Sequence, residues 1–339
     1  MESTTSPSIP NYGGQAVIEG VMMRSRRAMA VAVRHPAGHT VVHVEPLRSA
    51  RHRSRWARLP LIRGMVLLWD TLVLGMRALA FSANVAAEED LETDGDPSAE
   101  TPEEPQAPSE AFDTPQEEPA AMPQGVLWGT MIFAFAIGIG LFFVVPLLLV
   151  RTVDPLISWS VASNLLEGLV RLALFLGYVT LIGLLADVRR VFAYHGAEHK
   201  TINAFEAGVP LERERVTEYG TLHPRCGTSF LLVVVVLSIA VFSLLGRPEL
   251  PVRLASRVLL VPVIAGVSYE LLRFTAARRH LAPIRAVMAP GLLLQRLTTR
   301  EPDASQVEVA IEALRRLLTY EADHPTAAPA SPAASAAPG

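Results

Sequence analysis

Two histidines and a glutamate lie close together in the stretch FAYHGAEHKTINAFEAG, residues 192–208. In a helix, His195 and His199 would differ by about 40° around the axis, and Glu198 would lie about 60° to the other side of His195. The three side chains would therefore share one face. Two imidazoles at this spacing can bind one Zn²⁺, and an adjacent carboxylate can take a proton from water at the metal. The order His-x-x-Glu-His is the inverted form of the zincin motif.

Three residues elsewhere could supply a further ligand. His223 and Cys226 lie three apart in HPRCGTSF, a spacing that suits a turn presenting two zinc ligands. Glu270 lies near one end of a later apolar segment, where an ionisable side chain is functional or paired by default. We therefore predict a zinc site with the two histidines of the motif as ligands, Glu198 as the general base, and a third protein ligand from among these three residues.

Each of these features also has an ordinary structural explanation. The motif residues could pair with the neighbouring arginines at a membrane boundary, and His223 could bind a loop carbonyl. Cys226 could be a small buried residue at the start of a helix, and Glu270 could pair with Arg273 at i+3. Two functions therefore stay open: a metal-dependent hydrolase, and a non-catalytic transporter or assembly factor in which the same residues form a structural metal site or a polar network.

A second motif, GGQAVIEGVMMR, lies near the N-terminus. Its paired glycines, Gly13 and Gly14, permit backbone conformations that other residues avoid, and Glu19 interrupts an otherwise apolar run. No Gly-Lys-Ser/Thr follows, so the glycines do not form a phosphate loop. A tight turn with a surface carboxylate would explain the pattern equally well. We keep Glu19 as a further candidate and expect it to be brought toward the histidines.

The composition places these motifs in a membrane protein. Half of the 339 residues are hydrophobic and the mean hydropathy is +0.31, with the apolar residues concentrated in long runs. A basic block and an acidic block largely cancel, and neither resembles the surface of a nucleic-acid-binding protein. We predict a mainly α-helical polytopic bundle with about four spans. These are Val126–Val150, Leu169–Ala186, Thr228–Leu245 and Val258–Ala277.

Local sequence patterns predict the secondary structure of the segments around the bundle. Alternating apolar residues on both sides of Pro36 predict a β-hairpin, and residues 60–82 predict a strongly apolar helix lying in the membrane interface. Asp303 and Gln306 resemble a capping box ahead of an amphipathic helix. The predicted organisation is 1–85, hairpin and interfacial helix; 86–124, disordered acidic linker; 125–277, bundle with a cytoplasmic metal-site loop at 187–227; 278–322, amphipathic segment; and 323–339, disordered tail.

The segment that carries the histidines should be helical and cytoplasmic. We expect the helix of the second span to continue past the membrane to Ala207, where Gly208 and Pro210 stop it. Most Lys and Arg residues of the short connections lie at 187–227 and after the fourth span, which predicts that both regions are cytoplasmic. An even number of spans then returns the chain to its starting side, so both termini should be cytoplasmic.

The motifs GGQAVIEGVMMR, YHGAEHKTINAFEAG and HPRCGTSF, with SYELLR and LQRLTTREPDASQVEVAIEAL downstream, resemble the YqhQ-like family of bacterial membrane proteins. The resemblance covers nearly the whole chain except the acidic linker and the two tails. That family is of unknown function, and its members are labelled predicted metal-dependent enzymes. The resemblance implies a bacterial inner-membrane location and metal ligands among the motif residues. We expect the lipid bilayer and an unidentified substrate as partners, no nucleic acid, and leave self-association open.

Overall fold

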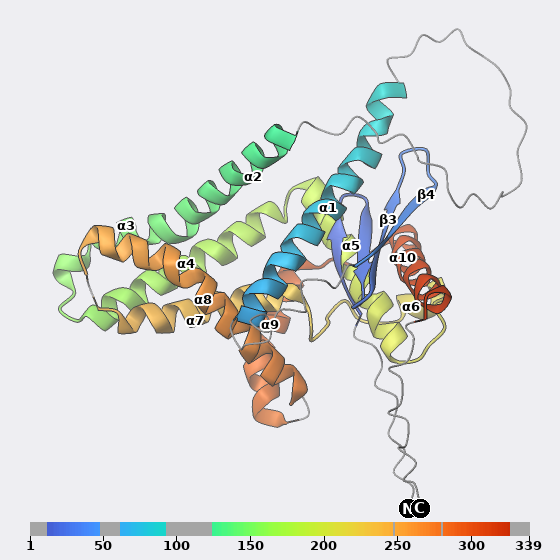
Figure 1. Ribbon diagram of the computed structural model, residues 1–339. Helices are drawn as coiled ribbons and strands as arrows, with labels where there is room; N and C mark the ends of the chain where they lie inside the picture. The colour runs from blue at the N-terminus through green and yellow to red at the C-terminus, as the bar shows by residue number, and fades with distance from the viewer. Residues whose placement is uncertain (1–11, 48–61, 93–123, 247, 279–280, 326–339) are drawn as a thin grey trace, which may run out of the picture.

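The computed structural model describes residues 12–47, 62–92, 124–246, 248–278 and 281–325 (Figure 1). A small β-sheet with its covering helices forms one part of the molecule, and a bundle of apolar helices forms the other. The chain is mainly α-helical, as the sequence predicts. The sheet contains four antiparallel strands in sequential order: β1 (Gly13–Val17), β2 (Gly20–Arg24), β3 (Ala28–Arg34) and β4 (Thr40–Pro46).

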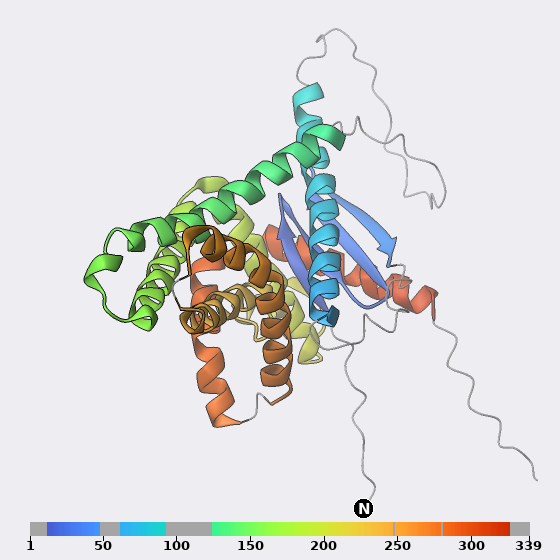
Figure 2. The same ribbon diagram turned by 60° about the vertical axis from the view of Figure 1, so that its left-hand side comes forward.

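Strand β3 shows why this sheet needs a cover on both faces. Its residues alternate between alanines and larger apolar side chains, and six of its seven residues are buried. The alanines face helices α5 (Ala186–Glu206) and α10 (Ala304–Asp323), while Met29, Val31 and Val33 face helix α1 (Ile62–Glu92). Figure 2 shows the sheet between α1 in front and α10 behind. The predicted hairpin is therefore the second half of a larger sheet.

The first half of the sheet comes from the glycine motif, for which the sequence left open a tight turn or a functional role of Glu19. The motif forms the β1–β2 hairpin, and Glu19 occupies its turn with a φ of 52°. A φ in this left-handed region is uncommon outside glycine, so a defined contact is needed to hold it. The next residue has to be glycine, because a Cβ at Gly20 would lie 2.2 Å from the carbonyl oxygen of Ala32. This hairpin supplies the packing partner that a two-stranded unit lacks.

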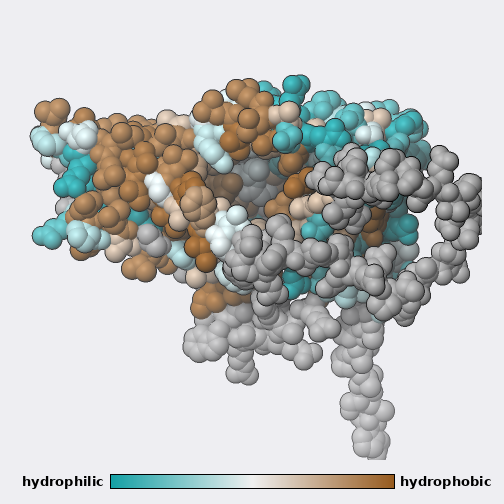
Figure 3. All heavy atoms as spheres, turned by 90° about the horizontal axis from the view of Figure 1, so that it is seen from above, coloured by the Kyte–Doolittle hydropathy of each residue, from teal (hydrophilic) through white to brown (hydrophobic). Residues whose placement is uncertain are grey.

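The bundle contains the remaining long helices. They are α2 (Gln124–Ile139), the π-helical turn η3 (Gly140–Val144), α3 (Val145–Arg151), α4 (Ser160–Ile182), α7 (Gly227–Leu244), α8 (Leu250–Ala277) and α9 (Ala282–Thr298), with a short helical turn at η4 (Asp154–Leu156). The short helix α6 (Arg213–Thr217) packs instead against α5 and α10. Helix α7 is central and packs against α4, α8 and α9. In Figure 3 the surface over the bundle is predominantly hydrophobic, and hydrophilic atoms flank it at the far left and over the sheet.

The helix that carries the histidines is separate from the second span, which corrects one prediction. Helix α4 ends at Ile182, and Leu185 is extended before α5 begins at Ala186. The break occurs because α5 packs against β1, β2 and α10 rather than along the bundle. The predicted stop is confirmed, since α5 ends at Glu206 and Gly208 adopts a φ of 72°.

Five helices among the described residues are long and apolar enough to cross a membrane: the four predicted spans and α1 at Ile62–Ala87. The packing of the sheet limits how many of them cross. Because β1 and β2 pack against α5, and β2 and β3 pack against α10, these elements would share one side of a membrane that the bundle crosses. An even number of crossings would then lie between the sheet and α5, and between α5 and α10. Crossings at α2–α3, α4, α7 and α8 would satisfy this condition, and α1 buries Ala78 and Val85 on the sheet.

Helix α1, which contains most of the predicted interfacial segment 60–82, packs against α8 of the bundle. Gly64 lies against α8, where an added Cβ would come within 3.1 Å of the Gly266 carbonyl oxygen. Helix α1 also extends to Glu92, past the predicted start of the acidic linker at residue 86. Most of that linker, residues 93–123, lies outside the described residues, as does the tail from residue 326. Asp303 and Gln306 form the predicted capping box of α10.

A buried cluster of charges joins the helices at the end of the bundle away from the sheet. Glu167 on α4 is 1% exposed and accepts hydrogen bonds from three guanidinium groups, at distances of 2.7–3.0 Å. The donors are Arg171 on α4 and Arg253 and Arg257 on α8. Arg257 also stacks on Phe242 of α7, with its Cζ 3.9 Å from the ring centroid. The Glu167 carboxylate therefore connects α4 to α8, and the stacking of Arg257 on Phe242 adds α7 to the cluster.

The packing of the sheet predicts a single-side topology that cysteine labelling can test. In a Cys226→Ala background, single cysteines at Glu45 and Glu312 should react with a membrane-impermeant maleimide from the same side of sealed vesicles. A cysteine at Leu156, which is 84% exposed in the turn before α4, should react only from the other side. Labelling of positions 45 and 312 from opposite sides would show that α1 crosses the membrane.

Removal of the Glu167 carboxylate should destabilise the bundle, because three buried guanidinium groups would lose their shared partner. Breaking a buried ion pair costs about 3–5 kcal/mol. We expect Glu167→Ala to lower the thermal unfolding midpoint in detergent by many degrees. Glu249→Ala is the matched control, because Glu249 is exposed and makes no side-chain bond at the start of α8. Equal midpoints for the two variants would contradict a structural role for the cluster.

Candidate functional site

Helix α5 is polar in sequence yet buried over much of its length. Ten of its residues are buried, including Glu198, His199 and Lys200. Gly196 permits the closest approach, because an added Cβ would lie 2.1 Å from the carbonyl oxygen of Arg300. The backbone N–H of Arg300 also donates to the carbonyl of Phe192 at 2.9 Å. The segment between α9 and α10 is thereby held along α5, one residue away from the first histidine.

Both histidines of the motif are oriented by backbone carbonyls. His195 Nδ1 lies 2.9 Å from the carbonyl oxygen of Thr298, and His199 Nδ1 lies 2.5 Å from that of Thr221. A carbonyl oxygen only accepts, so each Nδ1 carries the proton and each Nε2 keeps its lone pair. This arrangement, in which the second ring nitrogen donates to a fixed acceptor, is typical of metal-ligating histidines. The two rings lie 4.4 Å apart between centroids.

Cys226 lies beside these rings at the start of α7. It is the N-cap residue of that helix, and its sulfur accepts a hydrogen bond from the backbone N–H of Thr228. Its Sγ lies 3.2 Å from His195 Nε2. Gln295 on α9 fixes the preceding turn, because its side chain accepts from the N–H of His223 at 2.9 Å and donates to the carbonyl of that residue at 2.8 Å.

The ligand atoms of His195, His199 and Cys226 all lie within 4.8 Å of one another. A tetrahedral zinc with bonds of about 2.0–2.3 Å separates its ligand atoms by about 3.3–3.8 Å. The 3.2 Å between the cysteine sulfur and the first imidazole is close to this separation. Two imidazole nitrogens and one sulfur also form a donor set that zinc prefers. The residues present therefore fit a zinc ion bound by three protein ligands.

Glu198 lies on the same helix and is enclosed by strand β1. It is 5% exposed and accepts a hydrogen bond from the backbone N–H of Gly14. Burial raises the pKa of this carboxyl to about 7, while nearby His195 and the Gly14 bond act in the opposite direction. Gly14 has to be glycine because an added Cβ would lie 2.8 Å from the Glu198 Cδ and 2.6 Å from the Met22 carbonyl oxygen. The paired-glycine motif and the histidine motif thus meet directly.

Lys200 completes the polar part of the helix. Its ammonium group donates to the carbonyls of Thr217 at 2.8 Å and Tyr219 at 2.7 Å, and it pairs with Glu301 at 2.7 Å. The side chain is only 4% exposed. All three ammonium protons have an acceptor, so the lysine fixes the loop that carries the Thr221 carbonyl. Sequence reasoning overlooked Lys200, although a lysine directly after the second histidine was a visible signal.

His223 lies next to the cluster without belonging to it. Its ring centroid is 5.7 Å from that of His199, and its Nε2 is 3.6 Å from the carboxylate of Glu206. Arg225 also pairs with Glu206. The proposed role of His223 as a ligand stays a prediction, and its position supports the turn that carries the cysteine.

Two predicted site residues are held in ion pairs elsewhere. Glu270 on α8 accepts from Arg63 of α1 at 2.6 and 2.7 Å, where it joins the interfacial helix to the bundle. Glu19 accepts from Arg190 and, at 3.3 Å, from the hydroxyl of Tyr194. These contacts bring Glu19 onto α5, as expected. Its partners, however, lie on the turn of the helix before the histidines.

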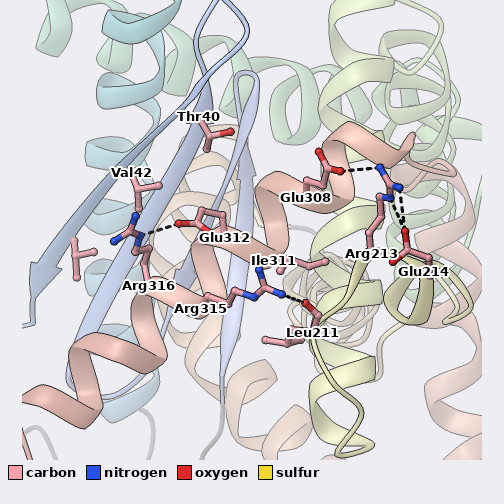
Figure 4. Close-up of a pocket in the computed structure, with 11 residues that line it drawn as sticks. Thr40, Val42, Leu211, Arg213, Glu214, Glu308, Ile311, Glu312, Arg315 and Arg316 are labelled. Atoms are coloured by element: carbon pink, nitrogen blue, oxygen red, sulfur yellow. Dashed lines mark hydrogen bonds and ion pairs between the residues drawn. The ribbon is translucent and has the colours of Figure 1, made fainter. Parts of the chain in front are cut away.

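A groove of about 780 Å³ lies between β4, α6 and α10 (Figure 4). Its charged side chains neutralise one another. Arg213 pairs with Glu214 and Glu308, and Arg316 pairs with Glu312. Figure 4 shows these pairs, of which Arg213–Glu308 joins α6 to α10, and Arg315, which donates to the carbonyl of Leu211. It contains no histidine or cysteine among its lining residues, so we place the candidate site at α5.

The backbone carbonyls of Thr221 and Thr298 could not be found from the sequence, because any residue type offers a carbonyl. The pairing of Glu167 with Arg171 could have been predicted from the sequence. A glutamate and an arginine four apart within an apolar segment can pair along one helix face.

Comparison with known proteins identifies the family of the chain. Residues 59–320 match a family described as protein of unknown function DUF1385. The chain is also 33% identical over 318 residues to the uncharacterized protein YqhQ of Bacillus subtilis (strain 168), covering 92% of this chain and 94% of that protein. No solved structure matches. The chain therefore belongs to the DUF1385 family of proteins of unknown function.

Proposed function

We propose that this protein is a membrane-embedded, zinc-dependent hydrolase. The observation that carries the proposal is the convergence of His195, His199 and Cys226, with both Nδ1 atoms bound to backbone carbonyls. Structural zinc sites usually hold four protein ligands, whereas catalytic sites hold three and leave one position for water or substrate. The three-ligand set therefore favours catalysis over the structural metal site.

Each residue of the site has a role in this proposal. The imidazoles and the thiolate would hold the ion, which supplies Lewis-acid chemistry and lowers the pKa of water. Glu198 would accept a proton from the attacking water and return it to the leaving group. Gly14 positions the carboxylate of Glu198 through its N–H, and the carbonyls of Thr221 and Thr298 hold the two rings in the required tautomer.

We further propose that the site lies at the cytoplasmic face of the bacterial inner membrane. The connection between α4 and α7 contains Arg189, Arg190, Lys200, Arg213, Arg215 and Arg225. Short connections rich in Lys and Arg remain in the cytoplasm. The sheet and α10 pack against α5, so they would share that side.

Metal analysis of the purified protein tests the site itself. Protein prepared without chelators should contain about one zinc per chain, because two imidazoles and a thiolate bind this ion. His195→Ala and His199→Ala should each lose it. His324→Ala serves as the control, because His324 is exposed and stacks on Tyr320 at the end of α10. A metal-free wild type, or retention of zinc with both motif histidines replaced, would refute the proposal.

In cobalt-loaded protein, Cys226→Ala should abolish the sulfur-to-cobalt charge-transfer band, whereas His223→Ala should keep it.

Replacement of Glu198 tests catalysis separately from metal binding. Glu198→Gln keeps a hydrogen-bond acceptor for Gly14 but cannot take up a proton. We expect unchanged zinc content and a fall of roughly 10²–10⁴-fold in the hydrolysis of chromogenic ester, amide and phosphoester probes. Glu206→Gln is the matched control at the far end of the same helix. Equal hydrolysis rates for wild type and Glu198→Gln would assign the carboxylate a structural role.

A further inference from the structure

An apolar pocket of about 260 Å³ lies between α7, α8 and α9, directly beside the turn that carries Cys226. We propose that this pocket holds one hydrocarbon chain of a membrane lipid and presents the polar end of that lipid to the His195–His199–Cys226 cluster. The inference rests on the proposed function and names its substrate class, a lipid that enters from the bilayer rather than from water.

The pocket follows one face of α7. The lining residues on that helix are spaced at i, i+3, i+4, i+7, i+8 and i+11, and they are Ser229, Leu232, Val233, Val236, Leu237 and Ala240. The eleven helical steps from Ser229 to Ala240 span about 16 Å at about 1.5 Å per residue. The hydrocarbon core of a bilayer is about 30 Å thick, so one leaflet contributes about 15 Å. The pocket is therefore as deep as one leaflet.

The chemistry of the lining changes along this length. Toward Ala240 the α7 face is purely aliphatic, and Ser229 and Thr275 are the only lining residues with polar side chains. Ser229 lies three residues from Cys226, and its hydroxyl accepts from Gln295 at 3.0 Å. The same amide group of Gln295 donates to the carbonyl of His223. The polar end of the pocket is thus continuous with the turn that carries the cysteine.

Helix α9 closes the pocket at this end. Gly291 lines it, and an added Cβ there would lie 2.9 Å from the Ser229 hydroxyl oxygen. The side chains around the opening face the apolar surface of the bundle. Val236 is 52% exposed and Val287 is 65% exposed. Hydrocarbon is the surrounding medium for a side chain such as Val236 in a spanning helix, so we take a lipid chain from the adjacent leaflet as the occupant. Among the residues that the structure describes, none that lines the pocket is charged, which argues against a soluble anionic substrate.

Photocrosslinking of the full-length protein in phosphatidylglycerol and phosphatidylethanolamine vesicles tests this occupant. One phospholipid probe carries a diazirine in the middle of an acyl chain, and a second carries it on the headgroup. The acyl probe should label α7 between residues 232 and 240, and the headgroup probe should label residues 221–229. Val233→Trp, which fills the pocket, should reduce both labels at least tenfold. Leu259→Trp should not, because Leu259 is 71% exposed on α8 and does not line the pocket.

The outcomes separate this inference from the proposed hydrolase. Labelling at the pocket that is lost in Val233→Trp, in protein without zinc, would support the lipid site and refute the hydrolase. Labelling spread equally over α2, α4 and α7, or unaffected by Val233→Trp, would show that bulk lipid alone surrounds the bundle and would overturn the inference. If Val233→Trp lowers the thermal unfolding midpoint, Ala240→Trp at the deep end provides the same comparison for the acyl probe.

Discussion

The candidate site depends on one constraint: a polar helix, α5, is buried between the sheet and α10. A buried polar group without a partner is costly, so every side chain of this kind needs an acceptor or donor in place. The backbone supplies most of them. Carbonyls of Thr217, Tyr219 and Thr221 come from one connection, and that of Thr298 from another. The same hydrogen bonds that offset the cost of burying α5 therefore fix the two imidazoles, and the Nε2 of His195 lies 3.2 Å from the sulfur of Cys226.

The closure of the chain on itself explains why the site can form at a membrane boundary. The sheet from the N-terminal region and α10 from the C-terminal region enclose α5 from two sides, although more than 250 residues separate β3 from α10. This arrangement requires an even number of crossings on each side of α5. Helix α1, apolar enough to span, packs on the sheet. Its apolar residues cover Met29, Val31 and Val33, which would otherwise be exposed.

Charged and polar side chains are arranged differently at the two ends of the bundle. At the far end, Glu167 accepts hydrogen bonds from three guanidinium groups, and this cluster joins α4 to α8. Near the sheet, the polar groups belong to loops and to α5, and the apolar pocket between α7, α8 and α9 opens beside them. The end of the bundle away from the sheet is held together by ion pairs. The end near the sheet has the metal-ligating atoms of the candidate site beside the apolar pocket. This division would suit chemistry on a membrane component.

The sequence alone determined the features that depend on local patterns. Long apolar runs identified the spans, Gly208 identified the end of α5, and Asp303 with Gln306 identified the start of α10, because each reflects periodicity or capping over a few residues. The spacing of His195, Glu198 and His199 placed these side chains on one helix. Glu198 and Cys226 also stood out as types that do chemistry.

Tertiary structure decided which of these residues meet. His195, His199 and Cys226 converge because of two tertiary contacts. Gln295 holds the turn at His223 that precedes Cys226, and the Thr221 carbonyl orients His199, both in a segment that the sequence shows only as a loop. Glu270 and Glu19 looked equally suitable, yet Arg63 and Arg190 neutralise them at other interfaces. The glycine motif showed no partner in sequence, and its role appears only where Gly14 contacts Glu198. Contacts of this kind join residues more than 170 positions apart, and no local pattern encodes such a distance.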